Sequence, residues 1–152
     1  MSQILNQVSD KEIAKEYKKR FFLKSGEKLS GSHDAANHLT VLLSNQQNIE
    51  QFAVIFLNAA NCLITSKIMF KGSLTQSAVY PREIIKKALE LDAAAIIVAH
   101  NHPSGETKPS RDDIQITNKI NDACKTVDVV LHDHIIITGK NGFYSFSDEG
   151  VL

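Results

Sequence analysis

Two runs of β-branched and aromatic residues dominate the middle of the chain. The first reads EQFAVIFL from Glu50 to Leu57, and the second reads NCLITSKIMF from Asn61 to Phe70. Runs of this kind, bounded by turn-prone residues, are typical of β-strands. Only the short segment from Asn58 to Asn61 separates them, so the pattern predicts two adjacent antiparallel strands joined by a tight connection.

The next two elements differ in the spacing of their apolar residues. Pro81 suits the first turn of a helix. The residues that follow place an apolar face at helical spacing, formed by Ile84, Ile85, Ala88 and Leu89. The segment from Ala93 to Ala99 is instead continuously apolar, which favours a strand that helices cover on both sides. We therefore expect a helix and then the central strand of the sheet.

The C-terminal part of the chain continues with one helix and two strands. A helix is predicted from about Ser110 to Val127, because apolar residues recur there at helical spacing. The segment from Val129 to Ile137 reads as another strand, GKNG as a tight turn and FYSF as a final short strand. Together the elements predict an α/β fold, a mixed sheet with helices packed on it.

Residues 1–31 form a polar arm in front of this pattern. Between Lys15 and Lys28 the basic residues clearly outnumber the acidic ones, which makes the segment locally positive. Ser9 and Glu12 have the spacing of a capping box, and apolar residues recur every four positions behind them, so one short helix is predicted. We interpret the arm as a solvated or partner-docking segment.

The remaining residues, 32–152, form the expected main domain. Ser32 is the predicted N-cap of its first helix, which runs to about Leu43. Of the 152 residues of the chain, 43% are hydrophobic, and this is enough to build one sizeable core. The sequence contains no internal repeat and no low-complexity tract, so we expect a single main domain.

Charge and cysteine content exclude several classes of protein. The 17 basic and 17 acidic residues cancel, so any contact with nucleic acid would have to be local. Cys62 and Cys124 lack CxxC spacing, which argues against a disulfide framework and a thiolate zinc site and fits a reducing cytoplasm. The start of the chain does not read as a signal peptide, and no segment approaches membrane-spanning length. We predict a cytoplasmic protein without membrane contact and leave its oligomeric state open.

Candidate chemistry is concentrated in the stretch AHNHPSGETKPSRDD. A buried strand ends there in His100, Asn101 and His102. Residues two apart in extended backbone point to the same side, so both imidazoles should face one spot. Asp113 follows in the first turn of the next helix, on the inward face, and a buried carboxylate needs a partner. A zinc ion shared with the two histidines would be that partner. Asn101 itself is expected to satisfy backbone groups of the loop.

This ligand set has a chemical consequence. Two histidines and one carboxylate leave the fourth tetrahedral position of zinc open for water, which is the arrangement of a catalytic site. Zinc makes such a water acidic enough to ionise near neutral pH, so neither Ser nor Cys is needed as a nucleophile. The water still needs a proton acceptor, and a glutamate just outside the ligand set is the usual type. We expect one Zn²⁺ per chain.

These residues resemble the JAMM motif of the JAB/MPN metalloproteins, and more specifically its RadC-like branch. The resemblance rests on Glu50, on His100-Asn-His102-Pro-Ser-Gly and on Ser110-x-x-Asp113, and it covers about residues 32–152, including PREIIKKAL and LHDHIII. It implies a cytidine-deaminase-like αβα layered fold and zinc held by His100, His102 and Asp113. It also implies a general acid/base at Glu50 and a role for Ser110 in stabilising the oxyanion.

One of these assignments has a rival, and one position departs from the family pattern. Glu50 is identified by its place two residues before Phe52 at the start of the first strand, and Glu27 is the weaker alternative. His132 stands where relatives commonly have an apolar residue before the Asp133-His134 pair. This departure alters the wall near the sheet and leaves the catalytic assignment untouched.

Ordinary structural roles compete with the chemical ones at the site itself. His100 and His102 would also fit a hydrogen-bonded pair that caps a strand, although their coincidence with Asp113 and the HPSG turn favours a metal. Asp113 is equally explained as an N3 residue favoured by the helix dipole, and Ser110 as an N-cap. Cap and catalytic roles can coexist, because the same helix start needs capping and delivers the ligand.

Ordinary structural roles are favoured for the four other histidines. His132 and His134 repeat the two-apart spacing, so a second metal site is conceivable, but no second carboxylate cluster follows and core or outer-shell roles are favoured. His33 and His38 lie five residues apart on one helix, roughly 140° around its axis, so they cannot easily share a metal. We expect ordinary surface or packing roles for this second pair.

The leading interpretation is a zinc-dependent metallohydrolase that cleaves a peptide or isopeptide amide bond in an unidentified peptide or protein substrate. The alternative is a DNA-associated RadC-like repair or accessory protein without protease activity, whose Lys15–Lys28 cluster would touch phosphate. Residues 1–31 are, however, too short for the helix-hairpin-helix segment of longer relatives and lack its Gly-rich hairpin.

Three other classes are less compatible with the residues. HNH nucleases disperse their three letters along a ββα-metal motif, whereas here they are consecutive. A zinc deaminase would show H-x-E and P-C-x-x-C, which this chain lacks. A catalytically dead scaffold of the MPN type would be expected to have lost ligands, and all of them are present.

Overall fold

The structure is a computed structural model that describes residues 6–73, 78–139 and 142–152. The elements of these ranges follow one another along the chain in a fixed order: α2 (Asp10–Phe21), α3 (Ser32–Leu42), the 3-10 turn η1 (Ser44–Gln46), β1 (Gln51–Leu57), β2 (Leu63–Lys71), α4 (Pro81–Glu90), β3 (Ala95–Asn101), α5 (Arg111–Thr126), β4 (Val130–Ile137) and β5 (Phe143–Ser145). The predicted helices and strands are therefore confirmed, with shifts of a few residues at their ends.

The strands form one mixed sheet in the order β2-β1-β3-β4-β5. β1 pairs antiparallel with both β2 and β3, β3 pairs parallel with β4, and β5 returns antiparallel to β4. The adjacent antiparallel pair β1–β2 and the central place of β3 were both predicted from the apolar runs. Of the expected GKNG turn, residues 140 and 141 lie outside the described residues.

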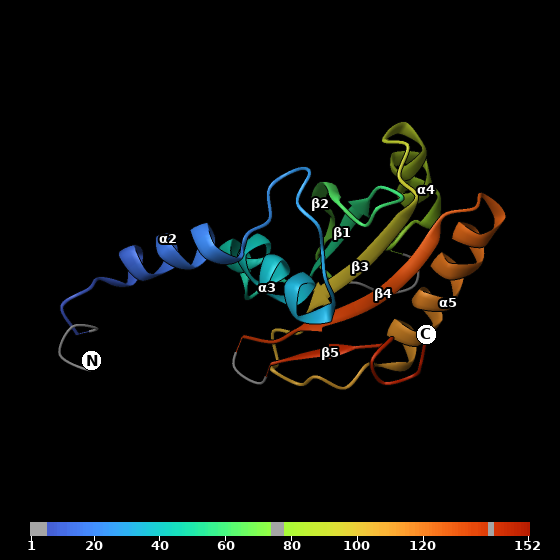
Figure 1. The fold of residues 1–152 in the computed structure, drawn as a ribbon. Coiled ribbons are helices and arrows are strands. Elements are labelled where there is room, and N and C mark those ends of the chain that lie inside the picture. The colour runs from blue at the N-terminus through green and yellow to red at the C-terminus, as the bar shows by residue number, and fades with distance from the viewer. Residues whose placement is uncertain (1–5, 74–77, 140–141) are drawn as a thin grey trace.

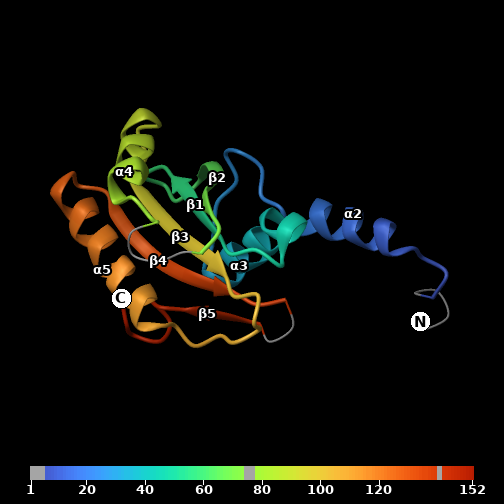
Figure 2. The same ribbon diagram turned by 180° about the vertical axis from the view of Figure 1, so that it is seen from behind.

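Helices cover both faces of this sheet, as Figures 1 and 2 show. Alternate residues of β1 separate the two cores: Phe52 and Val54 belong to the cluster that includes residues of α4 and α5, and Ala53 and Ile55 to the cluster that includes α3. This alternation follows from the period of two in a strand. The predicted αβα layering with a mixed sheet is confirmed.

Two local predictions about helices need correction. The N-cap of α3 is Gly31 and not Ser32, because the Ser32 hydroxyl donates to the Asp148 carboxylate over 2.6 Å. On α4, Pro81 does occupy the first turn and Ile84 is buried, but Leu89 is 53% exposed, so the apolar face is narrower than expected. Within the described ranges, the helices are too short or too polar to cross a membrane.

The N-terminal arm has two distinct parts. Helix α2 begins with the predicted capping box of Ser9 and Glu12, buries no residue and projects away from the sheet (Figure 1). The segment behind it lies against the domain: the backbone N–H of Leu23 donates to Nδ1 of His38 over 2.9 Å, and Leu29 is buried in the core cluster beside α3. The boundary expected at residue 31 stays a prediction.

Candidate metal centre

The end of β3 brings two imidazoles to one place. His100 lies in β3 opposite Phe52 of β1, and His102 is the first residue after β3. The backbone N–H of His102 donates to the carbonyl of Ile137 on β4 over 2.9 Å. The backbone thus stays extended through both residues, and the two Nε2 atoms lie 2.9 Å apart. The prediction that both rings face one spot is confirmed.

Asp113 approaches the same spot from the start of α5. One carboxylate oxygen lies 3.2 Å from Nε2 of His100, and the other lies 3.2 Å from Nε2 of His102. The carboxylate is held there by a capping box, in which Ser110 N–H donates to Asp113 Oδ2 over 2.8 Å and Asp113 N–H donates to Ser110 Oγ over 3.0 Å. Within the described residues, this is the group of three ligand-type side chains that can hold a metal ion.

The hydrogen bonds around His102 show whether these residues suit a cation. Nδ1 of His102 lies 2.7 Å from the backbone carbonyl oxygen of Glu106, and a carbonyl can only accept, so Nδ1 carries the hydrogen. In the neutral ring the Nε2 lone pair then faces the oxygens of Asp113. Lone pairs in contact repel one another, and a cation among them removes the repulsion. The donor set therefore fits a metal ion.

The pKa shifts of the site also indicate that positive charge is favoured between these residues. Burial alone would raise the pKa of Asp113, but His100 and His102, which donate to it when their rings carry a proton on Nε2, hold it well below its ordinary value. The hydrogen bond to Asp113 raises the pKa of His102, and the negative charge of Glu50 adds to this effect. When no metal is bound, a proton on the histidines supplies the positive charge, so metal binding is expected to release protons.

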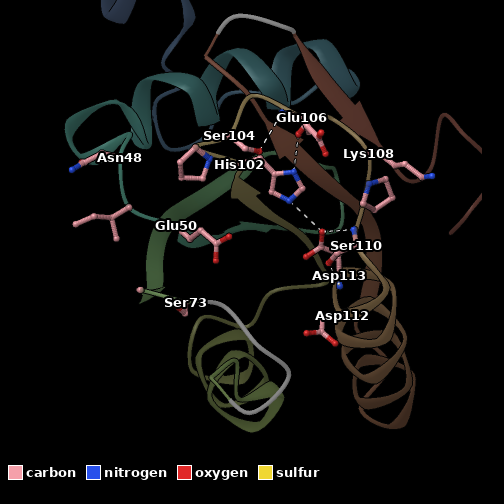
Figure 3. A pocket seen from close by; sticks show the side chains of 14 residues that line it. Asn48, Glu50, Ser73, His102, Ser104, Glu106, Lys108, Ser110, Asp112 and Asp113 are labelled. Carbon is pink, nitrogen blue, oxygen red and sulfur yellow. Dashed lines mark hydrogen bonds and ion pairs between the residues drawn. The ribbon is translucent and has the colours of Figure 1, made fainter.

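A cavity of about 860 Å³ opens in front of the group, and both remaining candidate residues line it together with His102 and Asp113. Glu50 stands immediately before β1, and Figure 3 shows its carboxylate directed across the cavity toward Ser110 and Asp113. Ser110 is the N-cap of α5 on the opposite wall. The structure thus brings together all five residues that the sequence singled out, while the roles of Glu50 and Ser110 stay predictions.

The rival glutamate lies at the wrong end of the sheet. Glu27 pairs through its backbone with Leu63, which stands opposite Leu57 at the far end of β1. His100, in contrast, stands opposite Phe52 near the start of β1. These two positions are at opposite ends of β1, so Glu27 lies a full strand length away from His100 and outside the candidate site.

The remaining histidines make separate contacts. The exposed His132 lies 3.0 Å from the side-chain oxygen of Asn61, whereas His134 is buried behind His100, with 2.7 Å between His134 Nε2 and His100 Nδ1. The two-apart spacing on β4 therefore does not form a second pair of ligands. His33 packs edge-on against Phe143, and His38 is buried and hydrogen-bonded, so packing roles are confirmed for both.

The expectation that Asn101 satisfies loop backbone groups is confirmed, because its amide bonds to Ile49 and Gln51, the neighbours of Glu50. One contact of the site went beyond the prediction from the sequence. Thr117 was not singled out, although it lies four residues after Asp113 on α5 and its hydroxyl contacts His134 Nδ1 at 2.6 Å. The helical spacing from Asp113 was the available signal for Thr117.

The fold and the site together define a class: a three-layer αβα domain that gathers two histidines from the end of its central strand and an aspartate from the next helix. Comparison with known proteins agrees with this class. A family model described as RadC-like JAB domain matches residues 29–151, and the chain belongs to this family.

Bacterial relatives extend the comparison. The chain is 42% identical over 130 residues to a UPF0758 protein of Photobacterium profundum, a match that covers 86% of this chain and 57% of the relative. A UPF0758 protein of Clostridium botulinum is 45% identical over 119 residues, covering 76% of this chain and 52% of the relative. UPF0758 protein YfjY of Escherichia coli is 45% identical over 103 residues, with 68% and 64% covered. The chain thus spans between about half and two thirds of the length of these relatives.

Proposed function

We propose that this chain is a zinc-dependent hydrolase that cleaves an amide bond in a peptide or protein substrate. The supporting observation is the convergence of His100, His102 and Asp113 at the wall of a cavity that Glu50 and Ser110 also line. Nitrogen and carboxylate ligands suit zinc, and three of them leave one position for water, as in catalytic sites. When bound, zinc would supply an acidified water and polarise the substrate carbonyl.

Glu50 is the proposed proton carrier. It lies outside the group of three ligands and lines the same cavity, with its carboxylate directed toward Asp113, which supports a role in accepting the proton of a water held in the cavity. The carboxylate takes the proton of the attacking water and then gives it to the leaving amine. Both transfers use one residue on one wall, which agrees with the single glutamate expected from the JAMM resemblance.

Ser110 is the proposed oxyanion donor. Its Oγ accepts the N–H of Asp113 over 3.0 Å, which leaves the hydroxyl hydrogen to point elsewhere. The residue lines the cavity and caps the N-terminal end of α5, where the helix dipole places partial positive charge. A negative oxygen that develops in the cavity would therefore meet a hydrogen-bond donor and a favourable field.

The test combines metal analysis with a screen of peptide and isopeptide substrates. The wild-type chain should hold zinc stoichiometrically, and His100→Ala should lose it. Glu50→Gln should keep the metal and lose turnover by roughly 10²- to 10⁴-fold, the usual contribution of a general acid/base. Glu90→Gln, the same substitution at an exposed site on α4, is the matched control and should behave like wild type. Stoichiometric zinc in His100→Ala would refute the ligand assignment.

Association with DNA is the second candidate function. It is favoured by α2, which projects from the domain, buries no residue and exposes Lys15, Lys18 and Lys19. Clustered exposed lysines attract phosphate regardless of base sequence. This candidate does not need the metal site, so the two functions can be tested separately.

A cytoplasmic location is proposed with either function. Both cysteines are free thiols, as expected in a reducing compartment. Cys124 is buried in the core beside α5, and burial raises the pKa of its thiol to about 11. The thiol is therefore unreactive at neutral pH and takes no part in the proposed chemistry.

A further inference from the structure

A chain of hydrogen-bonding groups runs behind His100, on the side away from the cavity. The hydroxyl oxygen of Thr117 lies 2.6 Å from the backbone carbonyl oxygen of Asp113 and 2.6 Å from Nδ1 of His134. Nε2 of His134 in turn lies 2.7 Å from Nδ1 of His100. Thr117 and His134 are 2% and 0% exposed, so water does not compete for these groups.

The direction of every hydrogen bond in this chain follows from its first member. A backbone carbonyl can only accept, and that of Asp113 lies 2.6 Å from the Thr117 hydroxyl oxygen, so we assign the single hydroxyl hydrogen of Thr117 to this bond. The Thr117 oxygen then accepts from Nδ1–H of His134. Because a neutral imidazole has one N–H, Nε2 of His134 must accept, and Nδ1–H of His100 donates to it. His100 is left with a lone pair on Nε2, the atom that faces Asp113.

We propose that His134 and Thr117 are positioning residues that fix the tautomer of His100 and so present its Nε2 lone pair to the metal. The inference rests on the proposed metal site. If the Thr117 hydrogen pointed to His134 instead, every bond in the chain would reverse and Nε2 of His100 would carry a hydrogen. A ring in that form cannot bind a metal through Nε2.

The two ligand histidines reach the same state by different routes. His102 donates Nδ1–H directly to the backbone carbonyl of Glu106. His100 lies in the buried strand β3, where the neighbouring backbone carbonyls belong to the sheet, and its Nδ1 meets a side chain that can either donate or accept. The direction at His100 therefore has to be set further along the chain, at the carbonyl of Asp113.

An irregularity in β4 places His134 behind His100. Leu131 pairs with Ile96 and Asp133 with Ile97, so His132 is an extra residue in the β4 side of the ladder. Regular alternation would align His134 with Ala99, on the face of α3. The extra residue aligns it with Val98 instead, on the face that α5 covers, where Thr117 lies. The bulge is thus required for the hydrogen-bonded series Thr117–His134–His100, which we call the relay.

A packing role alone predicts a different outcome for substitutions. His134 stacks on Phe146, with ring centroids 4.7 Å apart and planes at 13°. His134→Phe keeps an aromatic ring in this stack and removes both nitrogens, and Thr117→Val keeps the shape of Thr117 and removes the hydroxyl. Thr117→Ser restores the hydroxyl. His132→Phe is the matched control on the same strand, at the exposed position.

Heteronuclear NMR of the imidazole nitrogens in the metal-free chain, at a pH where the rings are neutral, reads the relay directly. In the wild type, both His100 and His134 should be Nδ1–H tautomers. In Thr117→Val, both should convert to the Nε2–H tautomer. Thr117→Ser should keep the wild-type pattern. An Nε2–H tautomer at His100 in the wild type, or an unchanged pattern in Thr117→Val, would overturn the proposal.

Zinc affinity, measured by competition with a chromophoric chelator, is the second readout. Thr117→Val and His134→Phe should weaken zinc binding by roughly 10- to 100-fold, whereas Thr117→Ser and His132→Phe should stay close to wild type. Wild-type affinity in both disrupting variants would leave His134 with a packing role only and overturn the relay while the metal site stands. Failure of the wild type to bind zinc through His100 would instead reject the proposed function, and the NMR result would still decide the tautomer.

Discussion

The side-chain oxygen of Asn101 accepts a hydrogen bond from the backbone N–H of Gln51, and the two atoms lie 2.6 Å apart. The amide nitrogen of Asn101 donates to the backbone carbonyl of Ile49 over 2.9 Å. Asn101 is therefore bonded to the residues on both sides of Glu50. Because it also stands between His100 and His102 in the chain, Asn101 ties the proposed proton carrier to the strand that supplies two ligands.

Replacing this amide should separate catalysis from metal binding. In Asn101→Ala the backbone around Glu50 loses both bonds, and a displacement of about 1 Å at a catalytic group can lower turnover by roughly 10²-fold. Zinc content should stay at the wild-type level, and the free energy of unfolding should fall by about 1–3 kcal/mol, because a buried N–H loses its acceptor. Turnover, zinc content and urea unfolding measure the three effects. Asn37→Ala, which removes an amide that contacts Tyr17, is the control; wild-type turnover in Asn101→Ala would contradict the prediction.

Zinc should stabilise the fold. A ligand present at about 1,000 times its dissociation constant adds about 4 kcal/mol to the free energy of unfolding. For a domain of this size the thermal midpoint should rise by roughly 8–16 °C, and a chelator should reverse the rise. Asp113→Asn should abolish the effect, because one ligand is lost, while Asp122→Asn, at an exposed position of the same helix, should keep it. An equal rise in Asp113→Asn would show that zinc binds elsewhere.

Acid should weaken the attachment of the arm at His38. Burial lowers the pKa of His38 to about 4 from 6.5. Between these values the unfolded chain binds a proton that the folded chain does not, so this contribution to stability is complete above pH 6.5 and is lost as the pH falls toward 4. A protonated ring also cannot accept the N–H of Leu23. We expect a loss of roughly 1–2 kcal/mol over this range.

The measurement is the difference in unfolding free energy between the wild type and His38→Gln, obtained by urea titration at several pH values. The comparison subtracts the titration of the other histidines. The difference should be largest near neutral pH and shrink on acidification. A difference that does not change with pH would show that His38 stays neutral for another reason or does not contribute.

The exposed lysines of α2 give a test of the DNA alternative. Lys15→Glu with Lys19→Glu should leave stability within about 0.5 kcal/mol, because both side chains are exposed. If α2 binds phosphate, the wild type should bind DNA at low salt and lose affinity steeply as salt rises, and the double variant should not bind. Lys86→Glu with Lys119→Glu makes the same change in net charge on α4 and α5. Absence of binding by the wild type at low salt would dispose of this function.

Much of the fold was predictable because the sheet is so strongly patterned. The continuous apolar run that forms β3 is typical of a strand covered on both faces, and the runs of β1 and β2 have one short connection between them. The errors arose where a tertiary contact decided the outcome. Ser32 does not cap α3, because its hydroxyl donates instead to the carboxylate of Asp148, which is distant in sequence.

The candidate site was predictable up to its first layer of contacts. His100, His102 and Asp113 are close in sequence, and the periods of strand and helix settle which way they point. The partner of His100 was not predictable, because period-two alternation puts His132 and His134 on one face. An unforeseen extra residue in β4 reverses this relation. A ladder irregularity depends on the neighbouring strand, so it leaves no local signature.

The relay behind His100 has a consequence for how the motif is recognised in other chains. A fragment that ended before β4 would still contain every residue of the JAMM pattern, from Glu50 to Asp113, and a search by sequence would score it as complete. Such a fragment would lack His134 on β4, whose ring contacts His100 Nδ1 and is proposed to orient this ligand. Possession of the motif and competence to bind zinc are therefore separate properties of a polypeptide in this family.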